Sequence, residues 1–198
     1  MFVMTIDQRR SRTDRDRVPD LLAAVADTPV LRPFDRTAGD EVQAVLTDPD
    51  AVVAVTLLLA DEGHWSIGIG IGAVETPLPA QTRAGRGEAF EQARAAVESA
   101  KAARPPLAVR GASRWAEHAD TALRLLTEIV TTRSAAGREA VALVRGGLRQ
   151  TAAAEELGIT PQAMSQRLRA ARWELESPTR ELVVDLLARA DRPAEDRR

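Results

Sequence analysis

The stretch Gln150-Thr-Ala-Ala-Ala-Glu-Glu-Leu-Gly-Ile-Thr-Pro-Gln-Ala-Met-Ser-Gln-Arg-Leu-Arg169 decides the fold of the C-terminal part of the chain. Gly158 can adopt the positive φ that reverses the chain, and Ala154 is small at the point where two helices must cross closely. Thr160 is a favourable N-cap, and Pro161 is a favourable first residue for the following helix. The pattern therefore predicts two short helices joined by a tight turn, a helix-turn-helix.

The second helix of this motif combines an apolar face with a polar one. Leu157, Met164 and Leu168 are expected to be buried, and residues 139–144 are expected to form a supporting helix. In a helix-turn-helix, the start of the second helix enters the major groove, where glutamine and arginine can pair with adenine and guanine edges. The motif favours DNA reading over its alternative, an ordinary pair of packed helices.

Two groups of side chains are predicted to contact DNA. The first group would meet phosphates and fix the position of the motif on the duplex, and the second group lies at the start and on the outer face of the second helix. The first group is Arg149, Gln150, Thr151 and Arg172, and the second is Thr160, Gln162, Ser165, Gln166 and Arg169.

Composition limits the other classes of function. The net charge of −2 and the pI of about 5.8 lack the basic excess typical of nucleic-acid-binding domains, which matters little where one small domain touches DNA. The chain has no cysteine, and its only histidines are His64 and His118, so thiolate zinc sites and histidine-rich metal sites are excluded. Charges come too early for a signal peptide, and the longest apolar run, residues 51–60, is too short to span a membrane. We expect a cytoplasmic protein without a membrane partner.

The N-terminal part alternates strand-like and helix-like segments. Apolar patterning and turn residues predict strands at 2–6, 30–34, 42–46, 65–74 and 107–110, and helices at 18–26, about 47–59 and 88–103. The order β-α-β-β-α-β-α-β predicts an α+β domain of ferredoxin-like or palm type, with helices on one face of an antiparallel sheet. In the strand at 65–74, isoleucine alternates with Gly68, Gly70 and Gly72, which predicts a bare face open to close backbone approach.

Four regions follow from these patterns. Residues 1–111 are predicted to form the palm-like domain, 112–134 a connector helix, 135–190 an all-α helix-turn-helix domain and 191–198 a disordered tail. The apolar spacing within residues 179–190 suits either core packing or dimerisation.

Two carboxylates mark a candidate metal site in the N-terminal domain. Asp7 ends the first strand and Asp40 lies in the hairpin turn, so the two could share a divalent cation. A solvated strand end and an Asp-rich turn would have the same sequence, and spacing alone does not separate these interpretations.

The surrounding motifs carry a family resemblance. The Asp-x-x-x-Ser opening at 7–11, the Gly-Asp-Glu-x-Gln segment at 39–43, the Ile-Gly-rich strand and the following Ala-Arg helix resemble the SatD family over nearly the whole chain. Members of that family also end in a helix-turn-helix. The same region is more distantly similar to the palm of class III nucleotide cyclases and diguanylate cyclases.

The cyclase resemblance implies that Asp7 and Asp40 bind magnesium, with Glu41 as a helper. Those cyclases carry an asparagine one helical turn before the arginine of the later helix, whereas here Phe90 stands in that relation to Arg94. The resemblance therefore implies a degenerate palm that binds a nucleotide or dimerises.

The leading hypothesis is a DNA-binding transcriptional regulator that forms a homodimer. Its palm-like domain would dimerise or sense a ligand, and its helix-turn-helix would read duplex DNA. It requires no cofactor, although a divalent cation or nucleotide could act as effector. One alternative is a metal-dependent, cyclase-like phosphoryl-transfer enzyme. Another is a helix-turn-helix that binds protein, for instance RNA polymerase.

Overall fold

The centre of the molecule is a five-stranded mixed sheet. The computed structural model describes residues 1–192 of the 198. The sheet has the order β2-β3-β1-β4-β5, and its neighbours are antiparallel except for the parallel pair β4 and β5. Its strands are β1 (Phe2–Gln8), β2 (Arg32–Arg36), β3 (Glu41–Leu46), β4 (Trp65–Ile71) and β5 (Leu107–Arg110).

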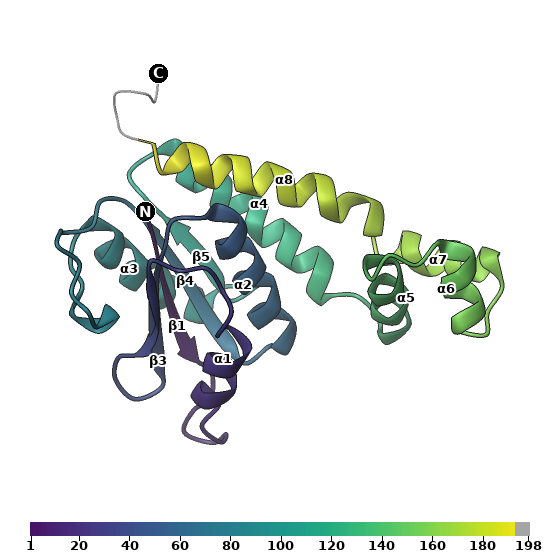
Figure 1. Cartoon of the computed structure of the whole chain (residues 1–198), viewed down its shortest axis with the longest axis horizontal. Coiled ribbons are helices and arrows are strands. Elements are labelled where there is room, and N and C mark those ends of the chain that lie inside the picture. The colour runs from purple at the N-terminus through teal and green to yellow at the C-terminus, as the bar shows by residue number, and fades with distance from the viewer. Residues whose placement is uncertain (193–198) are drawn as a thin grey trace.

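Helices connect the strands, except that a turn joins β2 to β3, and helices form the whole C-terminal region (Figure 1). The α-helices are α1 (Val18–Ala24), α2 (Pro49–Glu62), α3 (Glu88–Ala102), α4 (Arg114–Thr131), α5 (Ala135–Arg145), α6 (Gln150–Glu156), α7 (Pro161–Ala170) and α8 (Trp173–Ala190), and η1 (Thr82–Ala84) is a short 3-10 helix. The predicted α+β class and element order are confirmed. Within residues 1–192, no helix is both long and apolar enough to cross a membrane.

Helices cover both faces of the sheet, so the prediction of helices on one face of an antiparallel sheet was wrong. The main core lies between one face and helices α1, α2, α4 and α8, and α3 packs on the opposite face. The connection from β4 through α3 to β5 is a crossover, and a crossover returns the chain parallel to the strand it left. The crossover therefore adds β5 as a parallel neighbour of β4, and it adds α3 as a third layer.

The predicted bare face of β4 is confirmed, and α3 fills it. A Cβ added at Gly68 would lie 2.3 Å from the backbone nitrogen of Val97, and one at Gly70 would lie 2.1 Å from the carbonyl oxygen of Ala89. Only glycine leaves room for a helix this close. The opposite face of β4 carries Ile67, Ile69 and Ile71 into the main core.

The last helix, α8, returns from the C-terminal helices to the sheet domain. It packs along α4, and Val183, Leu187 and Ala190 are buried in the main core. The predicted domain 135–190 is therefore divided, because residues 140–171 share a separate small core and the end of α8 belongs to the larger one. Of the predicted tail, Asp191 accepts a hydrogen bond from the main-chain nitrogen of Met1, and residues 193–198 lie outside the described residues.

Candidate nucleic-acid interface

Helices α5, α6 and α7 form a compact module around a small apolar core. Ala140, Val141, Ala154, Met164 and Leu168 are buried in it, and partly buried side chains close its rim. Small alanines on α5 and α6 allow the helices to approach, whereas the larger side chains come from α7. The module thus has the three-helix arrangement predicted from its sequence, with a supporting helix longer than the expected 139–144.

The turn between α6 and α7 has the predicted geometry. Gly158 has a φ of +64°, and its amide nitrogen donates to the carbonyl oxygen of Glu155 at 3.0 Å. The next amide, that of Ile159, donates to Ala154 at 3.0 Å. Thr160 then caps α7, because its hydroxyl oxygen accepts a hydrogen bond from the amide of Ala163 at 3.1 Å. The direction of α7 is thereby fixed from its first residue.

Helix α7 presents opposite apolar and polar faces. Met164 and Leu168 are 0% and 4% exposed. Gln162, Ser165, Gln166 and Arg169 are exposed and recur at the three- and four-residue spacings that place side chains on one side of a helix. This outward stripe holds two amides, a hydroxyl and a guanidinium, all groups that can form hydrogen bonds with base edges.

All nine predicted DNA-binding residues are exposed. Among the residues that the structure describes, the side chains of Arg149, Arg169 and Arg172 form no ion pair or hydrogen bond. Arg172 has a φ of 53°, and it stands at the break between α7 and α8. The module therefore keeps three unneutralised guanidinium groups at its surface, as contacts to phosphates would require.

A charged cluster absent from the predictions joins the module to the long helices. Arg133, between α4 and α5, lies 2.6 Å from Glu176 of α8, and the two side chains are only 3% and 11% exposed. Arg145 of α5 also donates to Glu176 at 2.6 Å, and Arg133 Nε donates to the carbonyl oxygen of Ala171 at 2.9 Å. These contacts join residues far apart in the sequence, so no local motif could have predicted them. They fix the orientation of the module on α4 and α8.

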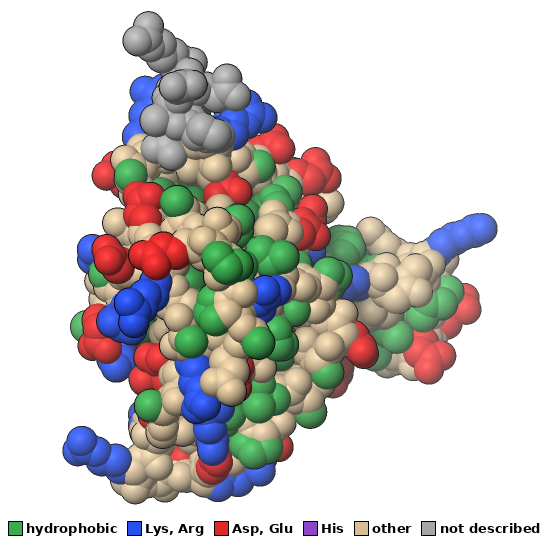
Figure 2. Space-filling view, turned by 60° about the vertical axis from the view of Figure 1, so that its left-hand side comes forward, with side chains coloured by type: hydrophobic (Ala, Val, Ile, Leu, Met, Phe, Trp, Pro, Cys, Tyr) green, Lys and Arg blue, Asp and Glu red, His purple; other side chains and the backbone are tan. Residues whose placement is uncertain are grey.

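The module stands off from the sheet domain. In Figure 1 it lies beyond the far ends of α4 and α8, and Figure 2 shows it projecting to one side with basic and acidic side chains on its surface. The main contacts of α7 are with α5, α6 and α8, and the side chains of its outer stripe are exposed. The outer stripe of α7 is thus not covered by the sheet domain.

The second predicted site, at Asp7 and Asp40, lies at the end of β1. Asp7 is paired in register with Glu41 of β3, and the main-chain oxygen of Asp40 accepts a hydrogen bond from Gln8 at 3.3 Å. Burial raises the pKa of Asp7, the neighbouring Lys101 opposes this, and the charges of Asp40 and Glu41 raise it further. The charges of Asp40 and Glu41 therefore lie close enough to act on the carboxyl group of Asp7.

A lysine from α3 accompanies this carboxylate group. Lys101 Nζ lies 3.4 Å from Asp7 Oδ2 and 2.8 Å from Glu98 Oε1, and the hydrogen bond to Glu98 is the main cause of the raised pKa of Lys101. Within the described part of the chain, no three side chains of the His, Cys, Asp or Glu types are arranged to hold a metal ion. The charged group that contacts Asp7 in the structure is the ammonium group of Lys101.

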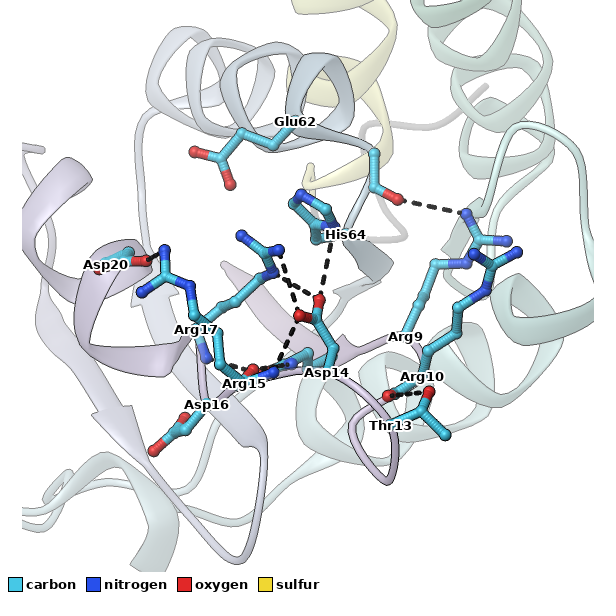
Figure 3. Close-up of polar contacts among 12 residues, drawn as sticks. Arg9, Arg10, Thr13, Asp14, Arg15, Asp16, Arg17, Asp20, Glu62 and His64 are labelled. Carbon is cyan, nitrogen blue, oxygen red and sulfur yellow. Dashed lines mark hydrogen bonds and ion pairs between the residues drawn. The ribbon is translucent and has the colours of Figure 1, made fainter.

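The loop after β1 is organised by internal contacts. Gln8 Nε2 donates to the carbonyl oxygen of Arg15 at 2.7 Å, and Gln8 Oε1 accepts from the amide of Arg17 at 2.9 Å. Figure 3 shows the Asp14 carboxylate between Arg17 and His64. Asp14 Oδ2 lies 2.6 Å from Arg17 Nε and 3.9 Å from His64 Nδ1. The hydrogen bond from Arg17 is the main cause of the lowered pKa of Asp14. These contacts of Gln8, Asp14 and Arg17 therefore hold the shape of the loop.

Among known proteins, no protein-family model, no curated protein and no solved structure matches the chain.

Proposed function

We propose that the chain is a sequence-specific DNA-binding regulator that reads duplex DNA through α7. The observation that carries the proposal is the division of α7 into a buried face, with Met164 and Leu168, and an exposed stripe of Gln162, Ser165, Gln166 and Arg169. An α-helix fits the major groove, where such side chains distinguish base pairs. A protein with this function would act in the cytoplasm, where it could reach genomic DNA.

The exposed arginines supply the second element of the proposal. Arg149 precedes α6 and Arg172 follows α7, so their guanidinium groups flank the reading helix along the chain. In this position they would bind phosphates on either side of the groove and fix the register of α7. Binding to phosphate releases counterions, so the affinity must fall as salt is added.

The decisive experiment is selection of sheared genomic DNA on the purified full-length protein and on a Gln166→Ala, Arg169→Ala variant. We expect the unaltered chain to enrich a shared site and the variant to lose it, because both side chains lie on the exposed stripe. A Gln81→Ala, Arg12→Ala variant removes the same residue types from the sheet domain and should enrich the same site. Absence of enrichment at low salt would refute DNA reading.

The sheet domain is proposed to be a ferredoxin-like palm related to that of the SatD family. Strands β2, β3, β1 and β4 are adjacent in that order and alternate in direction, as the four strands of a ferredoxin-like sheet do. We further propose that this domain dimerises and so sets the spacing of two reading helices, which predicts a two-fold symmetric DNA site.

Two alternative functions, an enzyme and a protein-binding helix-turn-helix, predict experimental results that differ from those of DNA reading. A metal-dependent phosphoryl-transfer enzyme would use Asp7 and Asp40, so replacing either residue should abolish its turnover, whereas DNA reading through α7 should survive the replacement. A helix-turn-helix that binds RNA polymerase or another protein would retain its partner while failing to enrich a DNA site. A salt series with isolated DNA separates the last case, because phosphate contacts require a steep dependence.

A further inference from the structure

A cavity of about 430 Å³ lies between the loop after β4 and helix α3, on the face of the sheet away from the main core. The loop contributes Arg83 and Arg86 to its lining, and α3 contributes Arg94. Two carboxylates, Glu75 and Glu91, line the same cavity. It is remote in sequence from the helix-turn-helix and shares no residue with the carboxylate group at the end of β1.

The arginines of this cavity are not neutralised by its glutamates. Among the described residues, the side chains of Arg86 and Arg94 form no ion pair or hydrogen bond, and Arg83 donates only to the amide oxygen of Gln81, at 3.1 Å. Like charges held in one concavity repel one another, and a bound anion relieves that repulsion. The charge arrangement thus favours an anionic ligand.

The loop that carries Arg83 and Arg86 is anchored to the edge of the sheet. Arg32 of β2 donates to the carbonyl oxygens of Pro79 and Leu78 at 2.8 and 3.0 Å. The hydroxyl of Thr82 donates to the carbonyl oxygen of Pro33 at 2.8 Å. The loop is therefore held in place before any ligand arrives, which reduces the entropic cost of binding.

The floor of the cavity also depends on a close approach. A Cβ added at Gly85 would lie 2.1 Å from the ring of Phe90, which is 7% exposed. The loop backbone therefore lies directly on the aromatic ring. Through this contact the loop arginines are held beside α3, whose next turn carries Arg94.

We propose that this cavity binds a small phosphate-bearing molecule through Arg83, Arg86 and Arg94. Guanidinium groups form paired, charge-assisted hydrogen bonds with phosphate oxygens, and a ligand with two linked phosphates can engage arginines from both walls. The volume exceeds that of a single phosphate group, so the remainder of the ligand occupies the same cavity. The proposal does not rest on DNA binding by the helix-turn-helix.

The test is calorimetric titration of the full-length protein with inorganic pyrophosphate at physiological ionic strength. We expect saturable binding, weakened about tenfold or more by Arg86→Gln and by Arg94→Gln, since each loses a charge-assisted contact. The control is Arg12→Gln, which removes one exposed arginine from the loop after β1 and should leave the affinity unchanged. All three side chains are exposed, so these variants should remain folded.

Three results would overturn the proposal. The first is no saturable binding of pyrophosphate, and the second is an affinity unchanged in both cavity variants. The third is an equal loss in Arg12→Gln, which would show diffuse attraction to the whole surface. Selection of genomic DNA by the same variants is measured separately, so failure of DNA reading and failure of the anion site give distinguishable results.

Discussion

At the scale of single residues, two glycines set the distance between α3 and the sheet. Gly68 and Gly70 lie under the backbone of α3, where a methyl group would overlap main-chain atoms. Gly72, further along the chain, would place a Cβ against the flexible side chain of Glu88 instead. The three glycines look equivalent in the sequence. The main chain beside Gly68 and Gly70 cannot easily shift to admit a methyl group, whereas the Glu88 side chain beside Gly72 can.

Gly70→Ala should lower the free energy of unfolding by roughly 1–3 kcal/mol, the usual cost of overpacking a core. The added methyl group can be accommodated only if α3 shifts as a whole. Urea denaturation of the two proteins measures the difference. Gly72→Ala is the matched control and should cost clearly less, and equal losses at both positions would contradict the close-approach argument.

Asp7 provides a prediction about pH. Its folded pKa is raised, chiefly by burial, so the folded state binds the proton more tightly than the unfolded chain. The stabilisation from this group is present below the unfolded pKa and is lost as the pH rises through the folded pKa. Relative to Asp7→Asn, the unaltered protein should therefore lose stability across that interval in urea denaturation. A stability difference that grows in the opposite direction would contradict the burial of Asp7.

At the scale of elements, the junction between the long helices and the module depends on Glu176. Its carboxylate meets both Arg133 and Arg145. Breaking a buried ion pair by removing one partner leaves an uncompensated charge, whereas replacing both partners by apolar residues is often neutral. The stability of the junction therefore requires both partners of the Arg133–Glu176 ion pair, or neither of them.

Glu176→Gln should destabilise the protein by roughly 3–5 kcal/mol, because the buried guanidinium of Arg133 loses its counter-charge. Thermal unfolding gives the overall effect, and hydrogen exchange in α5 to α7 reports the local one. Arg133→Met combined with Glu176→Met is the control and should recover most of the loss. If the double variant were as unstable as the single one, the ion pair would not be the cause.

Element positions were the most predictable part of the fold. Gly158 and Pro161 mark the turn and the start of α7, and the alternation in β4 identified its two faces. The side of the sheet taken by α3 and the pairing of β5 depend on contacts between distant segments, which local patterns do not encode. Helical periodicity predicted the exposed stripe of α7. The Arg133–Glu176 contact could not be predicted, because it joins two segments far apart in the sequence.

At the scale of the whole molecule, the helix-turn-helix module interrupts a continuous structure. Helix α4 packs against α8 and against β5, and α8 packs against α4 and α2, so the chain leaves the sheet domain through α4 and returns to it through α8. The apolar side chains of Val183 and Leu187 complete the main core from the far side of this interruption. The core of the sheet domain is therefore complete only with α8.

Two deletions should give opposite results. Replacing residues 135–171 by a short glycine-serine linker removes the small core alone and should leave a folded sheet domain with a cooperative thermal transition. Ending the chain at residue 171 removes α8 and should leave the main core exposed and the protein unfolded. Circular dichroism and thermal unfolding distinguish these outcomes. A folded protein lacking α8 would contradict the assigned core.

Any tilt of the paired helices would be amplified at the module that they carry. The 18 residues of α4 extend for about 27 Å, at about 1.5 Å per residue. A tilt of about 10° at the sheet would carry the far end through about 5 Å, which exceeds the roughly 3.4 Å step between successive base pairs. Small rearrangements in the packing beneath α4 and α8 would thus be amplified into a change of alignment at α7.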